Sequence, residues 1–265
     1  MYYTGIDLHR KTSFITTVDA KGQIVKKVNM SNDETTILEY FLSLDDDTQV
    51  VIESTSNWYW LYDLLSEHGM PVVVSNPVKT KAIASAKIKN DKLDSQMLAQ
   101  LLRADLLATV HVSSQQTRQL KELLRHRSKL VRDMVRMKNR IHNIMAKNNL
   151  SVPTSDLFGK RGLALLSEAK LPQHHRHQVN TYLTLYLQLK EHTEALTKQV
   201  KEYDSCNEMA QLLMTIPGVG AITAMFMVAE IEDIARFKSY RHLSSYAGLV
   251  PRLDASADKQ RTGRI

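Results

Sequence analysis

The feature that most constrains this chain is a long stretch, residues 113–150, that contains neither glycine nor proline. Both residues weaken or end helices, so their absence over this length favours one continuous helix. Apolar residues recur within it at three- and four-residue intervals, from Leu120 through Ile141 to Met145, which is the spacing of one helix face. The sequence therefore predicts a long amphipathic helix that needs a second helix to cover its apolar side.

The polar side of this helix is strongly basic. Within residues 118–147 there are ten Lys and Arg side chains against two acidic ones, whereas the whole chain carries a net charge of +7. A coiled coil usually mixes both signs on its surface, while an almost purely positive face suits the phosphates of a nucleic acid. The residues expected to lie against a phosphate backbone are Arg118, Lys121, Arg125, Lys129, Arg132, Arg136 and Arg140.

A second helical run, residues 178–203, is predicted to return antiparallel to the first. The two would form a basic helical hairpin, or coiled-coil linker, over residues 109–205. The connection between them holds two prolines and two glycines, and it ends near His174, His175 and His177. Because no second group of metal ligands lies nearby, these histidines are expected to be an exposed linker and not a metal site.

Short apolar runs alternate with amphipathic stretches over residues 1–108, which is typical of an α/β domain with a sheet flanked by helices. A turn at residues 19–22 predicts that the second and third strands form an antiparallel hairpin, and Asn32 or Asp33 is expected to cap the first helix. The order of three strands, helix, strand, helix, strand, helix is that of a ribonuclease H-like fold. The predicted strands are 2–8, 13–18, 23–29, 49–53 and 71–75, with a helix at 56–68.

Four carboxylates stand out in this domain. Asp7 lies on the first strand, Glu53 ends a central strand, and Asp91 and Asp94 lie three residues apart at the start of a helix, where they share one face. Each of the two helix acids alone could be structural, as an N-cap or a first-turn acid. Together the four predict a site for Mg²⁺, since hard cations prefer carboxylate oxygens and a pair of ions can assist phosphoryl transfer.

Residues 206–265 are expected to form a small helical domain that ends in a polar tail. Within it Gly218 and Gly220 lie between two helical segments, as in a helix-hairpin-helix element, whose exposed backbone N–H groups can bind a phosphate without reading sequence. A plain connection between helices is the alternative.

Composition excludes several classes of protein. The hydrophobic fraction of 43% and charged fraction of 24% are ordinary globular usage, which argues against a disordered or fibrous chain. A single cysteine, Cys206, excludes a disulfide framework and a multi-cysteine zinc site. Because we find neither a secretory signal nor an apolar run long enough to span a membrane, we expect a cytoplasmic protein without a membrane partner.

Five segments, taken in order, resemble the DEDD transposases of the insertion-sequence 110 family, and the resemblance covers nearly the whole chain. It implies a domain like that of the Holliday-junction resolvase RuvC, with Asp7, Glu53, Asp91 and Asp94 holding two Mg²⁺ ions. It also implies DNA recombination directed by a guide RNA, and a homo-oligomer that is a dimer or tetramer. The segments are GIDLH at 5–9, VIEST at 51–55, KNDKLD at 89–94, IPGVG at 216–220 and YAGLVPR at 246–252.

The resemblance further implies a C-terminal transposase domain whose serine attacks a DNA phosphate and becomes covalently attached. In the family this serine lies five residues after a proline and seven residues before a glycine. Here Ser256 lies five residues after Pro251 and seven before Gly263, so the resemblance identifies Ser256 as this serine. The family usually has glycine after the serine, where this chain has Ala257. Relatives continue past the position of Ile265 with a basic helical segment, so the transposase domain is expected to be truncated.

The sequence leaves other functions open. One is a structure-selective DNA endonuclease that uses the same carboxylates with water as the nucleophile, and another is an inactive protein that retains only nucleic-acid binding. An ATPase of the actin and sugar-kinase class would need a glycine-rich loop after the first strand, where residues 9–11 are His-Arg-Lys. A serine also needs activation, and no histidine lies within ten residues of Ser256. We therefore expect activation by the carboxylate and metal site, in the same or a different subunit.

Overall fold

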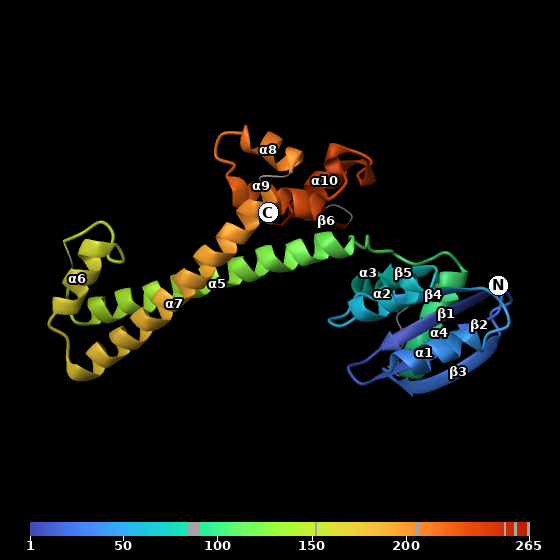
Figure 1. Cartoon of the computed structure of the whole chain (residues 1–265). Coiled ribbons are helices and arrows are strands. Elements are labelled where there is room, and N and C mark those ends of the chain that lie inside the picture. The colour runs from blue at the N-terminus through green and yellow to red at the C-terminus, as the bar shows by residue number, and fades with distance from the viewer. Residues whose placement is uncertain (84–90, 152, 205–206, 252, 257–258, 264–265) are drawn as a thin grey trace. The chain divides into compact units, whose positions relative to one another are not determined.

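The computed structural model describes residues 1–83, 91–151, 153–204, 207–251, 253–256 and 259–263 (Figure 1). Within this part the side chains of Asp91 and Ser256 are not described, and Cys206 and Ala257 lie outside it. The chain divides into two compact units, Met1–Val112 and Ser113–Ile265.

The first unit is built on a five-stranded mixed sheet with the strand order β3-β2-β1-β4-β5. Strands β1, β2 and β3 are joined as antiparallel neighbours, and β4 and β5 run parallel to β1. This arrangement confirms the predicted ribonuclease H-like order and the hairpin at residues 19–22. The strands are β1 (Tyr2–Leu8), β2 (Thr12–Val18), β3 (Ile24–Ser31), β4 (Thr48–Glu53) and β5 (Val72–Ser75).

Helices cover both faces of this sheet. On one face α1 (Glu34–Leu42) and α2 (Tyr59–Glu67) contribute to a buried core that includes Ile6 and Ile52. The cap of α1 is Asp33, whose carboxylate accepts a hydrogen bond from the Thr36 N–H at 2.9 Å. A short helix, α3 (Pro77–Ile83), follows β5, and α4 (Asp91–Arg103) contacts β1, β2 and β4.

Helix α4 lies directly on β1 because Gly5 has no side chain. A Cβ atom at Gly5 would lie 2.1 Å from the carbonyl oxygen of Ser95 and 2.6 Å from the amide nitrogen of Ala99. The hydroxyls of Ser95 and Thr16 are hydrogen-bonded at 2.8 Å and hold the helix in place. Side chains alternate along a strand, so Asp7 faces the same side of the sheet as Gly5, toward α4.

The second unit contains the predicted long helix, α5 (Gln115–Lys147), and its antiparallel partner α7 (Gln173–Asp204), which run side by side in Figure 1. The predicted linker was wrong, because α7 begins at Gln173 and His174, His175 and His177 lie in its first turns. The predicted exposure is confirmed for His174 and His177. Two contacts fix this early start. The Arg176 guanidinium donates hydrogen bonds to the carbonyls of Leu166 and Ala169. The ring of His175 forms a hydrogen bond with the Asn148 side chain.

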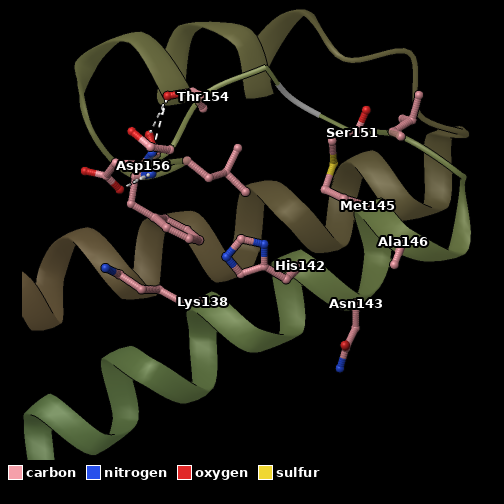
Figure 2. A pocket seen from close by; sticks show the side chains of 12 residues that line it. Lys138, His142, Asn143, Met145, Ala146, Ser151, Thr154 and Asp156 are labelled. Atoms are coloured by element: carbon pink, nitrogen blue, oxygen red, sulfur yellow. Dashed lines mark hydrogen bonds between the residues drawn. The ribbon is translucent and has the colours of Figure 1, made fainter.

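A further helix, α6 (Lys160–Glu168), closes the tip of this hairpin. The loop before it packs Phe158 against His142 and Tyr186, with ring centroids 5.5 and 5.1 Å apart. The Lys138 ammonium lies 4.9 Å from the centroid of the Phe158 ring. Figure 2 shows Lys138 and His142 facing this loop across a pocket of about 560 Å³. None of the residues predicted to be functional lines it.

The remaining elements pack near the start of α5. Helices α8 (Glu208–Met214), α9 (Ala221–Ile231) and α10 (Tyr240–Tyr246) follow one another, with a 3-10 turn, η1 (Ile234–Arg236), before α10. Helix α9 contacts both α5 and α7 through a core that includes Leu124, Val200 and Met225. The expected polar tail instead contains two paired antiparallel strands, β6 (Leu253–Ser256) and β7 (Lys259–Thr262). In the described part of the chain, no helix has the length and apolar character needed to span a membrane.

Candidate catalytic edge and basic helix

Asp7 and Glu53 lie at the ends of neighbouring parallel strands. The register pairs Gly5 with Val51 and Ile6 with Ile52, so Asp7 and Glu53 follow at the same edge of the sheet and on the side that faces α4. Adjacent strands are about 4.8 Å apart, which brings the two carboxylates into one neighbourhood. The Asp7 side chain is 19% exposed, so it is reachable from solvent without being freely solvated.

The direction of α4 brings its first turn to the same edge. Its last turns lie near the β2–β3 turn at the opposite end of the sheet, where the Gln100 amide donates to the Gly22 carbonyl at 2.7 Å. The helix therefore runs antiparallel to β1. Gly5 meets α4 between Ser95 and Ala99. From Gly5 to Asp7 the strand advances about 7 Å, which equals four to five helical residues counted back from that contact and ends between Asp91 and Asp94. Asp91 and Asp94 thus begin α4 at the level of Asp7. We call these four positions the catalytic edge.

The chemistry of the catalytic edge fits Mg²⁺, since all four side chains offer only hard carboxylate oxygens. Among the residues that the structure describes, no group of three or more His, Cys, Asp or Glu side chains is already placed to hold a metal ion. The side chain of Asp91 is outside that test. The assignment of Asp7, Glu53, Asp91 and Asp94 as metal ligands therefore stays a prediction, supported by shared position and donor type.

One residue beside the catalytic edge was not predicted from the sequence. The Nε2 atom of His9 lies 3.3 Å from an Asp7 carboxylate oxygen, and its side chain is 48% exposed. In the sequence, His9 belongs to the GIDLH segment and helps to exclude a phosphate-binding loop, but no site role was predicted for it. Its place directly after the first strand was the signal that it would stand beside Asp7.

Three of the seven predicted phosphate-binding residues on α5 are engaged within the second unit. Arg118 is only 8% exposed. The Lys121 ammonium donates a hydrogen bond to the Ser113 hydroxyl at 2.7 Å and lies 3.8 Å from the carboxylate of Glu230 on α9. The Arg125 guanidinium forms an ion pair with the same carboxylate at 2.6 Å. We call Arg118, Lys121 and Arg125 the covered basic face, in which Arg125 is 53% exposed and is occupied by its ion pair with Glu230 and not by burial. Lys121 and Arg125 join α5 to α9 through Glu230, a role that the charge pattern alone did not reveal.

The other four residues are exposed and continue the same side of the helix. Arg136 forms an ion pair with Asp133 one turn earlier at 2.7 Å, yet its side chain is 70% exposed. The Arg140 guanidinium lies 5.2 Å from the centroid of the Tyr182 ring. We call Lys129, Arg132, Arg136 and Arg140 the open basic face, because they remain accessible to a phosphate backbone.

Gly218 and Gly220 lie in the turn that joins α8 to α9, as the sequence predicts. Gly218 has a φ of +88°, a conformation that favours glycine, and Gly220 precedes the first residue of α9. No atom lies within 4 Å of where a Cβ would stand at either position, so the turn is open to a ligand. Phosphate binding there is a prediction.

Ser256 is the last residue of β6, paired with Lys259 of β7. The candidate nucleophile thus lies where a two-stranded hairpin reverses direction, and its role is likewise a prediction.

Two family models match this chain. A model of DEDD transposases of the IS110 type, described as a transposase, matches residues 4–148, and a model described as the transposase IS116/IS110/IS902 family matches residues 210–265.

Curated relatives point the same way. The chain is 25% identical over 255 residues to the transposase for insertion sequence element IS1328 of Yersinia enterocolitica, covering 96% of this chain and 75% of the relative. It is 24% identical over 261 residues to the transposase for element IS1111A of Coxiella burnetii, covering 97% and 70%. A pilin gene-inverting protein of Moraxella bovis is 25% identical over 211 residues, covering 77% of this chain and 56% of the relative.

Proposed function

Because this chain belongs to the IS110 family of DEDD transposases, enzymes that move insertion sequences by cutting and joining DNA, we propose that the catalytic edge and Ser256 carry out its chemistry. The observation that carries the proposal is the shared position of four carboxylates. Asp7 and Glu53 end neighbouring strands in register, and α4 begins with Asp91 and Asp94 at the same level. Like charges are costly to gather, and a bound cation gives them a reason to converge.

Asp7, Glu53, Asp91 and Asp94 would hold Mg²⁺, in our proposal as two ions. When bound, Mg²⁺ supplies stabilisation of the negative charge that develops on a phosphate during strand cleavage. The protein's own contribution is position. The backbones of β1 and β4 are fixed by the sheet, and α4 is fixed against Gly5 and Thr16, so the backbone positions that carry the carboxylates are defined before an ion binds.

Ser256 is the proposed nucleophile. Its hydroxyl oxygen would form a bond to a DNA phosphorus while the bond from that phosphorus to one sugar oxygen breaks. The serine proton leaves, and the released sugar oxygen takes up a proton, so charge and atoms balance. A serine hydroxyl is a weak nucleophile at neutral pH, and the carboxylate and metal site is the proposed source of its activation.

Binding of the nucleic acid is assigned to surfaces that make no base contacts. The open basic face and the Gly218–Gly220 turn would contact phosphates, which fixes the position of a strand but does not read its sequence. We propose that a guide RNA supplies sequence choice by base pairing. Recombination joins two DNA sites, which favours a homo-oligomer, a dimer or a tetramer, as the active form.

A covalent adduct tests the serine mechanism. Donor and target DNA, RNA from the flanking element and Mg²⁺ are incubated with the wild type, Ser256→Ala and Asp7→Ala, and the products are separated on a denaturing gel. A protein–DNA adduct that is lost in both variants is the expected result. DNA left intact by the wild type would contradict the proposal and favour a protein that only binds nucleic acid.

One specific observation keeps a second function in view. All four carboxylates lie in the first unit, so a DNA endonuclease of the RuvC type could use them with water as the nucleophile and without Ser256. In the same assay it would cleave DNA without forming an adduct, and Ser256→Ala would cleave as well as the wild type.

A further inference from the structure

The turn between β1 and β2 places two positive charges beside the catalytic edge. Arg10 and Lys11 follow Asp7 by three and four residues, and both are exposed. Within the described ranges, neither side chain has a hydrogen bond or an ion pair to another residue. The His9 N–H donates to the Thr12 carbonyl at 3.0 Å and closes the turn. Both side chains are therefore exposed, in the turn that follows the end of β1 where Asp7 lies.

The backbone of this turn is fixed by two asparagines from other segments. Tight hairpin turns usually contain residues with positive φ, and the described residues with positive φ do not include any from this turn. Asn32 and Asn57 instead donate their side-chain amides to the His9 carbonyl, at 2.7 and 3.1 Å. The Asn32 backbone N–H also donates to the Lys11 carbonyl at 3.0 Å. External hydrogen bonds thus replace the usual turn residues.

The bond from Asn57 joins the two strands that carry Asp7 and Glu53. Asn57 lies in the segment that follows β4, only four residues after Glu53, and its partner His9 lies two residues after Asp7. The turn, the end of β1 and the end of β4 are therefore linked. A group bound by Arg10 or Lys11 would be held at a defined position relative to both carboxylates.

The positive charges of Arg10 and Lys11 suit the binding of a DNA phosphate. Two bound Mg²⁺ ions would only neutralise the four carboxylates, so fixed positive charge nearby still favours the approach of a DNA strand. The arginine guanidinium matches two phosphate oxygens in a planar arrangement, and lysine adds a compact charge. We propose that Arg10 and Lys11 bind the backbone phosphate next to the one that is cleaved and so position the DNA strand over Asp7 and Glu53. This assignment as positioning residues rests on the proposed function of the catalytic edge.

The test separates charge from geometry with three variants. The double variant Arg10→Gln/Lys11→Gln removes both charges, Arg10→Lys/Lys11→Arg keeps them, and Asn57→Ala loosens the turn. Each is compared with the wild type for binding of a fluorescein-labelled DNA duplex, which carries a junction of element and flank, across a series of salt concentrations. Single-turnover cleavage is then measured at saturating DNA with Mg²⁺ and the guide RNA.

Loss of this one phosphate contact should reduce the slope of log affinity against log salt by about 0.9 in the Gln double variant. The charge-keeping variant should retain the wild-type slope. Misplacement of the strand should lower the single-turnover rate of the Gln variant by about tenfold to a hundredfold. Asn57→Ala should lower the rate while leaving the slope unchanged. Both side chains of the Gln variant are exposed, so its melting temperature should equal that of the wild type.

An unchanged slope in Arg10→Gln/Lys11→Gln would overturn the phosphate contact. A reduced slope with a normal single-turnover rate at saturating DNA would overturn the positioning role. Failure of the proposed function looks different, because the wild type and Asp7→Asn would then cleave equally well or not at all. In that case the binding slope alone still decides whether Arg10 and Lys11 contact phosphate.

Discussion

The division of α5 into a covered and an open basic face predicts how nucleic-acid binding depends on salt. Each phosphate contact contributes about 0.9 to the slope of log affinity against log salt for duplex DNA, so seven contacts would give about 6.3 and four would give about 3.6. Between 50 and 200 mM salt, these slopes correspond to losses of affinity of about 6,000-fold and about 150-fold. The two readings of the helix are therefore easy to distinguish.

A pair of matched double variants measures each face. Arg132→Gln/Arg136→Gln removes two open charges and should lower the slope by about 1.8. Lys121→Gln/Arg125→Gln removes the same charge from the covered face, where Glu230 already accepts both cations, and should leave the slope nearly unchanged. Because Arg125 is 53% exposed, loss of its ion pair should cost less than about 1 kcal/mol of unfolding free energy.

Fluorescence anisotropy of a labelled DNA duplex, titrated at several salt concentrations, gives the slope for each protein. Glu230→Gln offers a complementary measurement, because it releases Arg125 and should raise affinity at low salt. If the covered-face variant lost as much slope as the open-face variant, the assignment of Lys121 and Arg125 to internal ion pairs would be refuted. The nucleic acid would then have to displace Glu230.

Three further predictions concern stability. Gly5→Ala forces α4 away from β1 and should lower the free energy of unfolding, measured in urea, by about 3 kcal/mol or more. Gly220→Ala has open space around it and should lower the free energy of unfolding by less than about 1 kcal/mol. Equal urea midpoints for the two variants would contradict the close approach of α4 to Gly5. Burial raises the pKa of Tyr40 to about 12, against the lowering effect of its bond to Thr17. Since its folded pKa is raised, this group's stabilising contribution is complete below about pH 10 and is lost as pH rises toward 12. In a spectrophotometric titration, the wild type should retain about one more protonated tyrosine at about pH 11 than Tyr40→Phe. Phe158→Ala removes a buried aromatic ring and should destabilise the second unit by about 3–5 kcal/mol. Leu185 is exposed, so Leu185→Ala should destabilise it by much less. Similar melting temperatures for these two variants would argue against the aromatic core at the hairpin tip.

Much of the first unit follows from sequence because its signals are local. Alternating apolar residues fix the strands, a turn ending in Gly22 fixes a hairpin, and Asp33 caps α1. The position of Asp7 at a strand end follows from the same pattern. The contact of α4 with Gly5 does not, because it depends on two segments about ninety residues apart in the chain.

The second unit shows where local signals fail. Gly162 makes residues 160–168 look like a linker, yet it lies inside α6, where a Cβ would be 2.3 Å from the Asp156 carbonyl and only glycine fits. The start of α7 depends on Arg176 reaching carbonyls of an earlier segment. The same limit applies to the basic helix, since only the fold reveals that Glu230 takes up part of its charge.

The length of the open basic face sets how much nucleic acid one hairpin can grip. Lys129 and Arg140 are eleven residues apart on a continuous helix, which corresponds to about 16 Å. One DNA strand places a phosphate about every 3.4 Å along the helix axis, so this face spans about five nucleotides. A full turn of the double helix is about twice as long. If the protein protects more than half a turn of the DNA duplex, the additional contacts must therefore come from other surfaces of the chain or from a second copy of it.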